Sequence, residues 1–361
     1  MKNQVLVLSN SSDGLYGFRK ELLAELSQQS TLCASVPDNG RFEELRALGC
    51  QVVETPIDRR GLNPFSDLKL LMRYIRLIRS FKPTRVITYT IKPNIYGGFA
   101  CQLFHVPYAA NITGLGTTFQ KDGILRKLVI WLYRFALRKA DVVFFENCGN
   151  METILDLRIL AAEKCCLLNG AGVNLEHYSL MPYPQEAEPV RFLFIGRIMR
   201  EKGVQELFEA MERLIRECYP CQLDLVGYFE EDFKTLIDQN VKEGWLHYHG
   251  YQNDVRPFIR NSHCFVLPSW HEGMANTNLE CAAMGRPLIT SRIHGCMEAV
   301  IEGESGFLCE PQNTDSLYEA MVRFCEMPQN KREAMGRAGR RHMEEVFDKG
   351  KVVAETLERI I

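Results

Sequence analysis

The chain has 361 residues, of which 46% are hydrophobic and 24% are charged. This composition is that of a folded globular protein and excludes a disordered, collagen-like or coiled-coil chain. The net charge of −2 hides two unlike halves: residues 1–180 carry 22 basic and 16 acidic side chains, and residues 181–361 carry 21 basic and 29 acidic ones. At about 100–200 residues per domain, the length predicts two domains.

Short apolar strands alternate with amphipathic helices along the chain, which is the pattern of parallel βαβ units. The first predicted strands occupy residues 5–8, 32–36, 51–54, 85–89, 108–112, 141–145 and 165–168. After a proline-rich segment, further strands are predicted at 191–195, 222–226, 246–249, 264–267 and 287–290. We therefore expect an α/β protein with doubly wound, Rossmann-like domains at 1–180 and 191–345, a linker at 181–190, and a final helix at 346–361 that could cross back to the first domain.

In the first half, polar loops that follow strands are candidates for ligand contact, because ligands of open α/β sheets bind at the carboxyl ends of strands. The loop after residues 5–8 contains glycines, but it lacks the GxGxxG spacing of a dinucleotide site. Segments 89–94 and 111–119 form a second polar rim, in which a tight turn without a ligand is the alternative interpretation. The residues singled out in these loops are Gly14, Tyr16, Lys92, Asn94, Thr113 and Gly114.

The basic excess of the first half is concentrated in residues 59–139, with 15 basic and two acidic side chains. Two amphipathic helices carry most of it, residues 67–81 with Ser66 as the predicted cap, and residues 124–139. Basic helices with aromatic residues suit an anionic membrane surface, although a solvated basic face is the alternative. No apolar run reaches the roughly 20 residues of a membrane span, so we expect peripheral contact only. Nucleic acid is not an expected partner, because no recognition motif accompanies the charge.

In the second half, the first motif is the loop 196–203, which leaves a predicted strand and enters a helix. It places Arg197 and Lys202 next to Gly196 and Gly203, beside a helix N-terminus. Helix N-termini favour anions, and two cations add charge-assisted hydrogen bonds to a diphosphate. A solvated basic turn is the alternative interpretation.

The second motif is the loop 268–275 and the helix that follows it. Glu272 lies at the strand exit, and Glu280 lies inside the helix. This spacing would let one carboxylate face each end of a nucleotide sugar while the amides between them meet its diphosphate. Two ordinary surface glutamates are the alternative. The residues between them with candidate amides are Gly273, Met274, Ala275 and Asn276.

Together, these motifs closely resemble the retaining nucleotide-sugar glycosyltransferases of family four, which have the GT-B fold with two domains facing across a cleft. The resemblance covers most of residues 191–311 and includes the segments 285–290 and 304–308. It implies that Arg197 and Lys202 bind the donor diphosphate, Glu272 the transferred sugar and Glu280 the ribose. One departure is visible, because the family often has proline at the position of Ala275.

The resemblance also assigns expected roles to the remaining residues. The residues counted as catalytic are Arg197, Lys202 and Glu272. Donor contacts are expected at Gly14, Gly196, Gly273, Met274, Ala275, Asn276 and Glu280, with the backbone near Tyr251 at the base. Acceptor contacts are expected at Tyr16, Lys92, Asn94, Thr113 and Gly114. The segments 89–94 and 111–119 resemble bacterial enzymes that extend undecaprenyl-diphosphate-linked sugars, some of them N-acetylgalactosaminyltransferases.

We therefore expect a glycosyltransferase that moves an N-acetylhexosamine, GalNAc or GlcNAc, from a UDP-sugar to a polyprenyl-diphosphate-linked saccharide. The pathway would build a surface polysaccharide, such as O-antigen or capsule, or another glycan. The 13 cysteines are scattered through the chain, which predicts a reducing, cytoplasmic location, at the inner face of the membrane. Because Arg197, Lys202 and a helix N-terminus would hold the diphosphate, no cofactor or metal ion is expected, and the absence of an Asp-x-Asp motif agrees with this. Alternatives are GDP-mannose or a UDP-hexose as donor, a soluble acceptor, an epimerase, or a non-catalytic regulator that binds nucleotide sugars.

Overall fold

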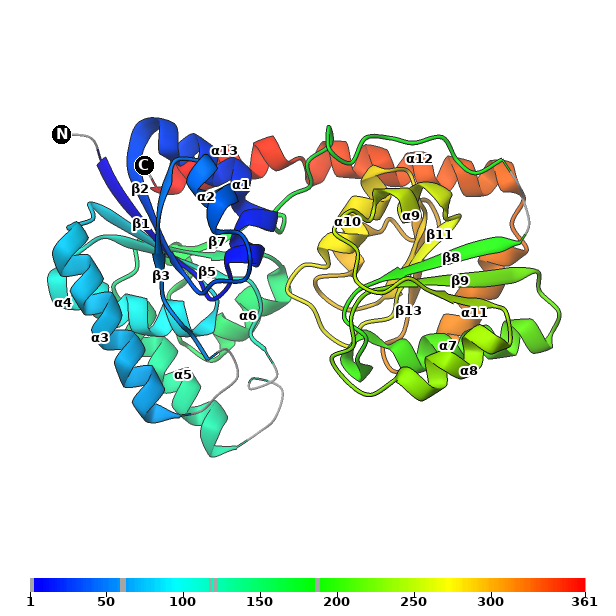
Figure 1. Ribbon diagram of the computed structural model, residues 1–361, viewed down its shortest axis with the longest axis horizontal. Helices are drawn as coiled ribbons and strands as arrows, with labels where there is room; N and C mark the ends of the chain where they lie inside the picture. The colour runs from blue at the N-terminus through cyan, green and yellow to red at the C-terminus, as the bar shows by residue number, and fades with distance from the viewer. Residues whose placement is uncertain (1–2, 59–62, 117–118, 120–122, 186–188, 361) are drawn as a thin grey trace. The chain divides into compact units, whose positions relative to one another are not determined.

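The computed structural model describes residues 3–58, 63–116, 119, 123–185 and 189–360. The chain divides into two compact units, Met1–Ala171 with Gly350–Ile361, and Gly172–Lys349. In each unit, helices cover both faces of a parallel sheet (Figure 1). The predicted fold class, an α/β protein with two doubly wound sheets, is confirmed. Residues 186–188 of the predicted linker and Thr117–Thr118 of the segment 111–119 lie outside the described residues.

The sheet of the first unit has the strand order β3-β2-β1-β4-β5-β6-β7 within the described residues. All of its neighbouring strands pair in parallel. The order reverses direction between β1 and β4, as in a doubly wound sheet. The strands are β1 (Asn3–Leu8), β2 (Ser30–Val36), β3 (Cys50–Glu54), β4 (Arg85–Tyr89), β5 (Tyr108–Ile112), β6 (Val142–Phe145) and β7 (Cys165–Leu167).

The strands of the first unit are apolar on both faces, because helices pack on each. Along β1, Val5 and Val7 point into one apolar core, and Leu6 and Leu8 point into the other. The first core is covered by α1 (Ser12–Gln29), α2 (Phe42–Ala47) and α13 (Lys349–Ile360). The second is covered by α3 (Pro64–Phe81), α4 (Gly98–Phe104), α5 (Ile124–Leu137) and α6 (Cys148–Asp156).

The start of α3 differs from the prediction. Ser66 was expected to cap the helix, but α3 begins at Pro64 and its N-cap is Asn63, whose side chain accepts a hydrogen bond from the Phe65 amide at 3.0 Å. Proline is well suited to the first helical turn, where its missing N–H has no partner to lose. The Ser66 hydroxyl instead donates to the Asn63 carbonyl.

No helix of the described residues combines the length and the apolar character that a membrane span requires.

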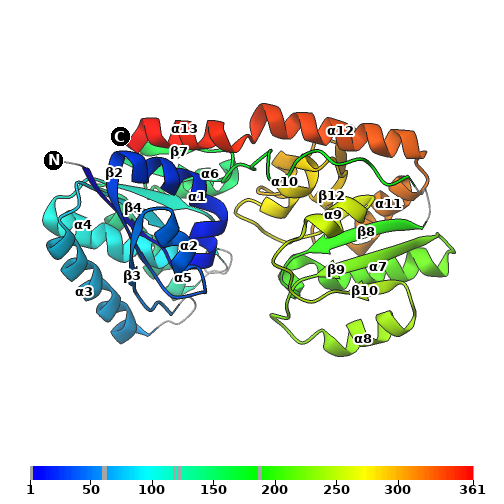
Figure 2. The same cartoon turned by 45° about the horizontal axis from the view of Figure 1, so that its top comes forward.

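The sheet of the second unit has the order β10-β9-β8-β11-β12-β13. Its strands are β8 (Val190–Ile195), β9 (Cys221–Val226), β10 (Leu246–Tyr248), β11 (Cys264–Leu267), β12 (Leu288–Ser291) and β13 (Gly306–Cys309). Two groups of helices cover its opposite faces (Figures 1 and 2): α7 (Val204–Arg216), α8 (Lys234–Lys242) and α11 (Thr314–Cys325) on one, α9 (Arg256–Asn261), α10 (Asn276–Ala283) and α12 (Gln329–Val346) on the other. Strand β13 was not predicted, since it is short and begins with glycine, a residue depleted in strands.

The chain passes between the units at Ala171–Gly172 and again at Lys349–Gly350, rather than near residues 180 and 345. The two crossings run side by side, because the Val173 amide donates to the Phe347 carbonyl at 2.7 Å and the Lys349 amide donates to the Val173 carbonyl at 3.1 Å. Most of α13 therefore belongs to the first unit although it follows the second in sequence.

The start of the predicted linker is packed against the second unit by Arg286, a fully buried arginine. Its guanidinium donates to the carbonyls of Pro182 at 2.8 Å and Met181 at 3.4 Å, and it lies over the Tyr183 ring. It also donates to carbonyls at the end of α9. Burial lowers the pKa of Arg286 to about 10, so the guanidinium is still charged at neutral pH, and its donors are taken up by these carbonyl oxygens. Residues 181–183 are thus part of the second unit.

Replacing Arg286 is expected to destabilise the second unit. Arg286→Met fills similar space but leaves several buried carbonyls without a donor, so the free energy of unfolding should fall by about 3 kcal/mol or more. Arg292→Met is the matched control, since Arg292 is exposed and its pairs with Glu302 and Glu310 should contribute less than about 1 kcal/mol. Denaturant unfolding of both variants tests this, and equal losses would contradict it.

Candidate functional site

The strand order of the second unit brings both predicted motifs to one place. Strand β8 pairs with β9 on one side and with β11 on the other, so the direction of winding reverses between β8 and β11. Ligands of open α/β sheets bind outside the carboxyl ends of strands at such a reversal. The loop 196–203 leaves β8, and the loop 268–275 leaves β11. The two motifs therefore leave adjacent strands at the expected ligand-binding edge.

The two loops are in direct backbone contact. Gly203 has a φ of +69°, and a Cβ atom there would lie 2.1 Å from the carbonyl oxygen of Pro268. Only glycine fits this position, for conformational and steric reasons. Nearby, the Trp270 amide donates to the Glu201 carbonyl at 2.9 Å, and the Trp270 indole donates to Glu206 at 3.0 Å. The loops thus hold each other in place before any ligand binds.

Lys202 and Glu272, from the two loops, form an ion pair. The Lys202 ammonium contacts Oε1 of Glu272, and the Ser269 hydroxyl donates to the same oxygen at 2.8 Å. Both side chains are mostly shielded, with 17% and 12% exposed. Lys202 and Glu272 were predicted to bind neighbouring parts of one ligand. The structure shows that they also contact each other, at a place that is largely shielded from solvent. Because an ammonium has three N–H donors, Lys202 can hold Glu272 and an anionic oxygen at the same time.

Arg197, the other predicted cation, is more exposed. One of its guanidinium nitrogens lies 3.7 Å from a carboxylate oxygen of Glu230, and its side chain is 38% exposed. A contact of this length between partly exposed groups constrains the side chain weakly. Arg197 is thus accessible at the same loop as Lys202, and Gly196 precedes it directly after β8.

Helix α10 begins at the second motif, but not all of the predicted amides are available. Ala275 precedes the helix, and its amide donates to the Gly295 carbonyl at 2.7 Å. The Ala275 amide is therefore engaged by the protein, which departs from its predicted role. The Met274 side chain is buried in the apolar core, so only its backbone could meet a ligand. Asn276 opens the helix, and its buried Oδ1 has no partner among the described residues.

Glu280 lies further along α10 and is partly shielded from solvent. Burial raises the pKa of its carboxyl to about 7, against a hydrogen bond from the Tyr178 hydroxyl and the charge of Lys349, which both lower it. The Tyr178 contact was not predicted, because residues up to 180 were assigned to the first domain. Glu280 can still accept hydrogen bonds from a polyol when it is ionised.

Two exposed tyrosines follow β9 and β10 at the same edge. The Tyr228 and Tyr251 rings are 47% and 57% exposed, and their centroids lie 6.2 Å apart. The preceding glycines are linked by a 2.9 Å hydrogen bond from the Gly227 amide to the Gly250 carbonyl. In the sequence, a Gly-Tyr pair follows each of the two strands, and this repeated pair is the signal that points to the two tyrosines. An exposed aromatic pair offers a stacking surface to a planar ring.

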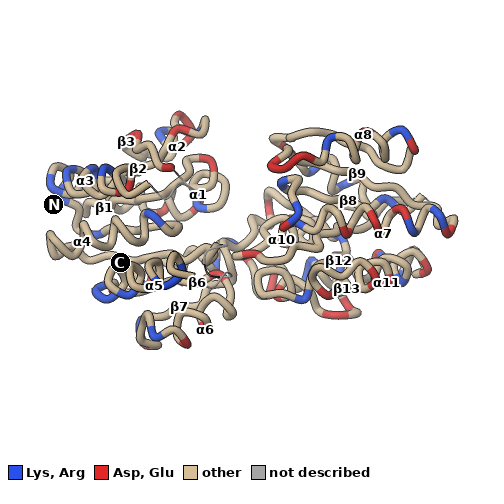
Figure 3. Tube along the Cα trace, turned by 90° about the horizontal axis from the view of Figure 1, so that it is seen from below, with Lys and Arg blue, Asp and Glu red and all other residues tan. Residues whose placement is uncertain are grey.

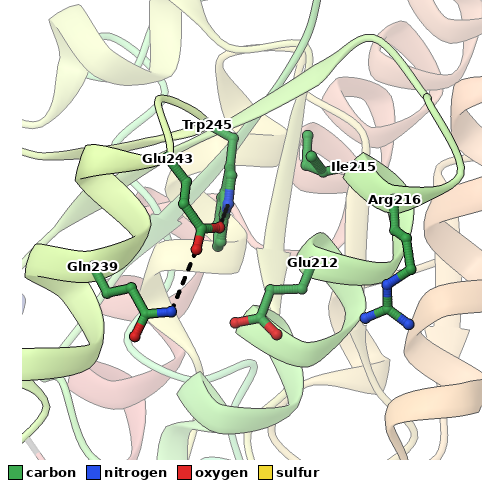
Figure 4. Close-up of a pocket in the computed structure, with 6 residues that line it drawn as sticks. All are labelled: Glu212, Ile215, Arg216, Gln239, Glu243 and Trp245. Carbon is green, nitrogen blue, oxygen red and sulfur yellow. Dashed lines mark hydrogen bonds between the residues drawn. The ribbon is translucent and has the colours of Figure 1, made fainter.

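A separate groove in the second unit contains none of the predicted residues. It is lined by side chains from α7, α8 and the start of β10, with Glu212 and Arg216 on α7 and Trp245 before β10 (Figure 4). In Figure 4 the Trp245 indole meets Glu243, with a nitrogen–oxygen distance of 3.1 Å. These residues lie at the C-terminal ends of the helices, hence at the amino edge of the parallel sheet, away from the loops of the two motifs.

In the first unit, Gly14 and Tyr16 do not lie in a loop. Helix α1 begins at Ser12, and the Ser11 hydroxyl caps it by accepting a hydrogen bond from the Gly14 amide at 3.0 Å. A Cβ atom at Gly14 would meet nothing closer than 3.5 Å, so close backbone approach does not require this glycine. Tyr16 lies within reach of the cations of Lys20 and Arg41.

The polar rim of the first unit is only partly available to a ligand. Asn94 is fully buried, accepts a hydrogen bond from the Thr88 hydroxyl at 2.7 Å and donates to the Asn111 carbonyl at 2.9 Å. Its side chain joins β4 to β5, which does not fit the predicted acceptor contact. Lys92 pairs with Asp67 of α3 at 2.7 Å.

Thr113 and Gly114 follow β5 and remain partly accessible. Across the same sheet edge, a buried ion pair joins Arg19 of α1 to Glu146, which follows β6. The sequence did not predict this pair, because its partners are 127 residues apart and neither belongs to a recognisable motif.

Comparisons with known proteins agree with this geometry. A family model for glycosyl transferases of group 1 matches residues 189–327, and a glycosyl transferase 4-like domain model matches residues 20–194. A Campylobacter jejuni N,N'-diacetylbacillosaminyl-diphospho-undecaprenol alpha-1,3-N-acetylgalactosaminyltransferase is 26% identical over 88% of each chain. The capsular polysaccharide biosynthesis glycosyltransferase CapM of Staphylococcus aureus is 24% identical over 88% of this chain and 86% of its own.

Solved structures show the same fold over the whole chain. The HepE protein of Anabaena in complex with UDP matches with a TM-score of 0.80 at 17% identity, covering 99% of this chain and 100% of its own. A sucrose-phosphate synthase from Thermosynechococcus elongatus matches with a TM-score of 0.81 at 18% identity, covering 99% and 98%. The two parallel sheets thus form a GT-B fold.

Glu280 is expected to make stability depend on pH. Its pKa in the folded chain, about 7, lies above the ordinary 4.5, so its contribution is fully present below about pH 4.5 and is lost as the pH rises through about 7. Between about pH 5 and pH 8, the wild type should lose about 2–3 kcal/mol relative to Glu280→Gln. Denaturant unfolding of both proteins at the two pH values measures this difference, and parallel pH profiles would show that the carboxyl is not shifted.

Proposed function

Because the chain belongs to the group 1 glycosyltransferases, a retaining family, we propose that it moves an N-acetylhexosamine from a UDP-sugar to a polyprenyl-diphosphate-linked saccharide. The observation that carries the proposal is the meeting of Lys202 and Glu272 at the winding reversal between β8 and β11, beside the start of α10. In this assignment the second unit holds the donor, and the first unit holds the acceptor. The product would belong to a surface polysaccharide, such as O-antigen or capsule, or another glycan.

Stabilisation of the leaving group would carry the chemistry. When the bond between the sugar and the diphosphate breaks, negative charge develops on the departing UDP. Lys202 and Arg197 would neutralise this charge. Lys202 is already held by Glu272, and a cation set in place before the reaction costs no reorganisation during it. The dipole of α10 adds a smaller favourable potential at its N-terminus. No group of the protein is needed as a metal ligand in this scheme.

The two glutamates would hold the ends of the donor. Glu272, fixed by Lys202 and Ser269, can accept hydrogen bonds from hydroxyls of the transferred sugar. Glu280, joined to Tyr178, can accept them from the ribose. The exposed rings of Tyr228 and Tyr251 would lie against the base. UDP as the nucleotide is supported by the similarity to HepE, which was solved with UDP.

The lipid-linked acceptor is supported by the relatives. The Campylobacter jejuni enzyme and an Escherichia coli UDP-Gal:alpha-D-GlcNAc-diphosphoundecaprenol alpha-1,3-galactosyltransferase both carry a diphospho-undecaprenol acceptor in their names. The Escherichia coli enzyme is 26% identical over 74% of this chain and 73% of its own. With such an acceptor, the protein would work in peripheral association with the inner face of the cytoplasmic membrane.

Removing either cation of the donor loop should reduce turnover strongly. Lys202→Ala and Arg197→Ala are each expected to lower kcat by roughly 10²–10³, the usual effect of losing one charge-stabilising donor. Arg200→Ala is the matched control, because Arg200 is an exposed cation of the same loop and should change kcat by less than about twofold. Initial rates of sugar transfer measure the effect, with thermal unfolding to show that the variants are folded. Near-normal turnover in both variants would refute the assignment of the site.

A panel of substrates tests the identity of donor and acceptor. UDP-GalNAc, UDP-GlcNAc, UDP-hexoses and GDP-mannose are incubated with polyprenyl-diphosphate mono- and disaccharides or with soluble saccharides, and products are read by mass spectrometry. We expect transfer from a UDP-N-acetylhexosamine to a lipid-linked acceptor. Transfer only from GDP-mannose, or only to soluble saccharides, would contradict this proposal. Binding of nucleotide sugar without transfer or hydrolysis would indicate a non-catalytic regulator.

A further inference from the structure

Helices α3 and α5 of the first unit expose an unusual number of large apolar side chains. The most exposed are Phe65 at 76% and Ile124 at 88%, one at the start of each helix. In α5 the exposed residues recur at spacings of four and three and form one stripe, within which Trp131 lies against Phe135 with ring centroids 4.6 Å apart. We call the following six residues the α3/α5 surface: Phe65, Leu68, Met72, Ile124, Leu128 and Trp131.

The fold itself does not need this surface. Each helix already packs on the sheet through a separate buried face. In α3 that face contains Leu70, Tyr74 and Ile78, and in α5 it contains Tyr133 and Leu137. An ordinary covering helix has one apolar stripe and a polar opposite face. A second apolar face on two helices of the same unit therefore marks an interaction surface.

The surface lies at the carboxyl edge of the sheet. Helix α3 leads into β4, and α5 leads into β6. In a parallel sheet each such helix returns from the carboxyl edge to the amino edge, so both helices begin at the edge where ligand loops lie. Figure 1 shows the starts of α3 and α5 pointing in the same direction within this unit. Phe65 and Ile124 are therefore carried at the same edge as the loops that follow β1, β4 and β5.

Cations surround the apolar side chains, and acidic groups are nearly absent. Lysines and arginines recur along both helices, as Figure 3 shows. Among them, Lys69, Arg76 and Lys127 are exposed. The two helices contain one acidic residue, Asp67, and its carboxylate is bound by Lys92 at 2.7 Å. A second copy of this face would bring cations against cations. The combination of apolar, aromatic and basic side chains fits an anionic lipid surface instead.

We propose that the α3/α5 surface inserts into the interface of an anionic membrane. The apolar side chains enter the boundary between headgroups and acyl chains, Trp131 lies at the headgroup level, and the surrounding lysines and arginines bind anionic headgroups. The inference rests on the proposed function in one respect. The bilayer that the carboxyl edge of the first unit would face is the one that would hold the lipid-linked acceptor.

Vesicle flotation tests the surface directly. The full chain is mixed with phosphatidylcholine vesicles with and without phosphatidylglycerol, at low and high salt. We expect binding only to the anionic vesicles and weaker binding at high salt, since each cation near such a surface adds about fivefold to partitioning. The double variant Lys69→Glu with Arg76→Glu should reduce binding at least about tenfold. Binding by wild type that is unaffected by phosphatidylglycerol and by salt would overturn the proposal.

A second pair of variants separates insertion from charge. Ile124→Ser with Leu128→Ser removes apolar contact and keeps every cation, and we expect at least about tenfold weaker vesicle binding. Val241→Ser with Ile301→Ser is the matched control, because these exposed apolar residues belong to the second unit, and binding should not change. If wild type ignores vesicles and forms a dimer that Ile124→Ser with Leu128→Ser separates, the surface is an interface between copies.

Activity assays distinguish this inference from the proposed function. The same variants are assayed with lipid-linked acceptor dissolved in detergent, where insertion is not needed and rates should equal the wild-type rate. Transfer in detergent by a protein that ignores anionic vesicles would overturn the membrane surface and leave the proposed function intact. A second outcome is that the variants weaken vesicle binding as expected but the wild type transfers no sugar. That outcome would refute the proposed function and leave the membrane surface intact.

Discussion

The contact between the loops that leave β8 and β11 is the constraint on which the candidate site depends. A glycine at position 203 lets its backbone approach the carbonyl of Pro268 so closely that a Cβ atom would lie 2.1 Å from that oxygen. This contact is possible because the two strands are neighbours at the reversal of the sheet. It brings Lys202 and Glu272 together although 70 residues separate them in the chain. Cation, carboxylate and helix N-terminus are therefore preorganised as one group.

Charged residues in this protein fall into two kinds that look alike in the sequence. Arg286 is fully buried, and its donors satisfy carbonyls of its own unit. Lys202 is also shielded, but it lies at the ligand-binding edge and keeps donors beyond its contact with Glu272. Only the position of the side chain relative to the strand ends separates the structural cation Arg286 from Lys202, the cation proposed to bind the donor. The same distinction makes Asn94 a core residue of the first unit despite its place in a polar rim.

The two units use their carboxyl edges for different proposed tasks. In the second unit this edge has paired loops, an ion pair and exposed tyrosines, which suits a small anionic ligand. In the first unit the same edge begins two helices with apolar and basic exposed faces, which suits an extended lipid surface. The basic excess of residues 1–180 is in keeping with the proposed lipid surface.

The sequence by itself determined the fold class and the positions of the two loop motifs at 196–203 and 268–275. Hydrophobic periodicity, strand length and short motifs are all set by residues that are neighbours in the chain. It placed β8, β9 and β11 within one residue of their observed bounds. Tertiary structure alone decided which distant groups meet: the Lys202–Glu272 pair, the Tyr178–Glu280 contact and the buried Arg19–Glu146 pair. It also decided that residues 181–183 pack on Arg286, that Asn94 is buried, and that the Ala275 amide is taken by Gly295. Contacts between residues far apart in the sequence depend on strand order and on close packing, and the local spacing of residues determines neither.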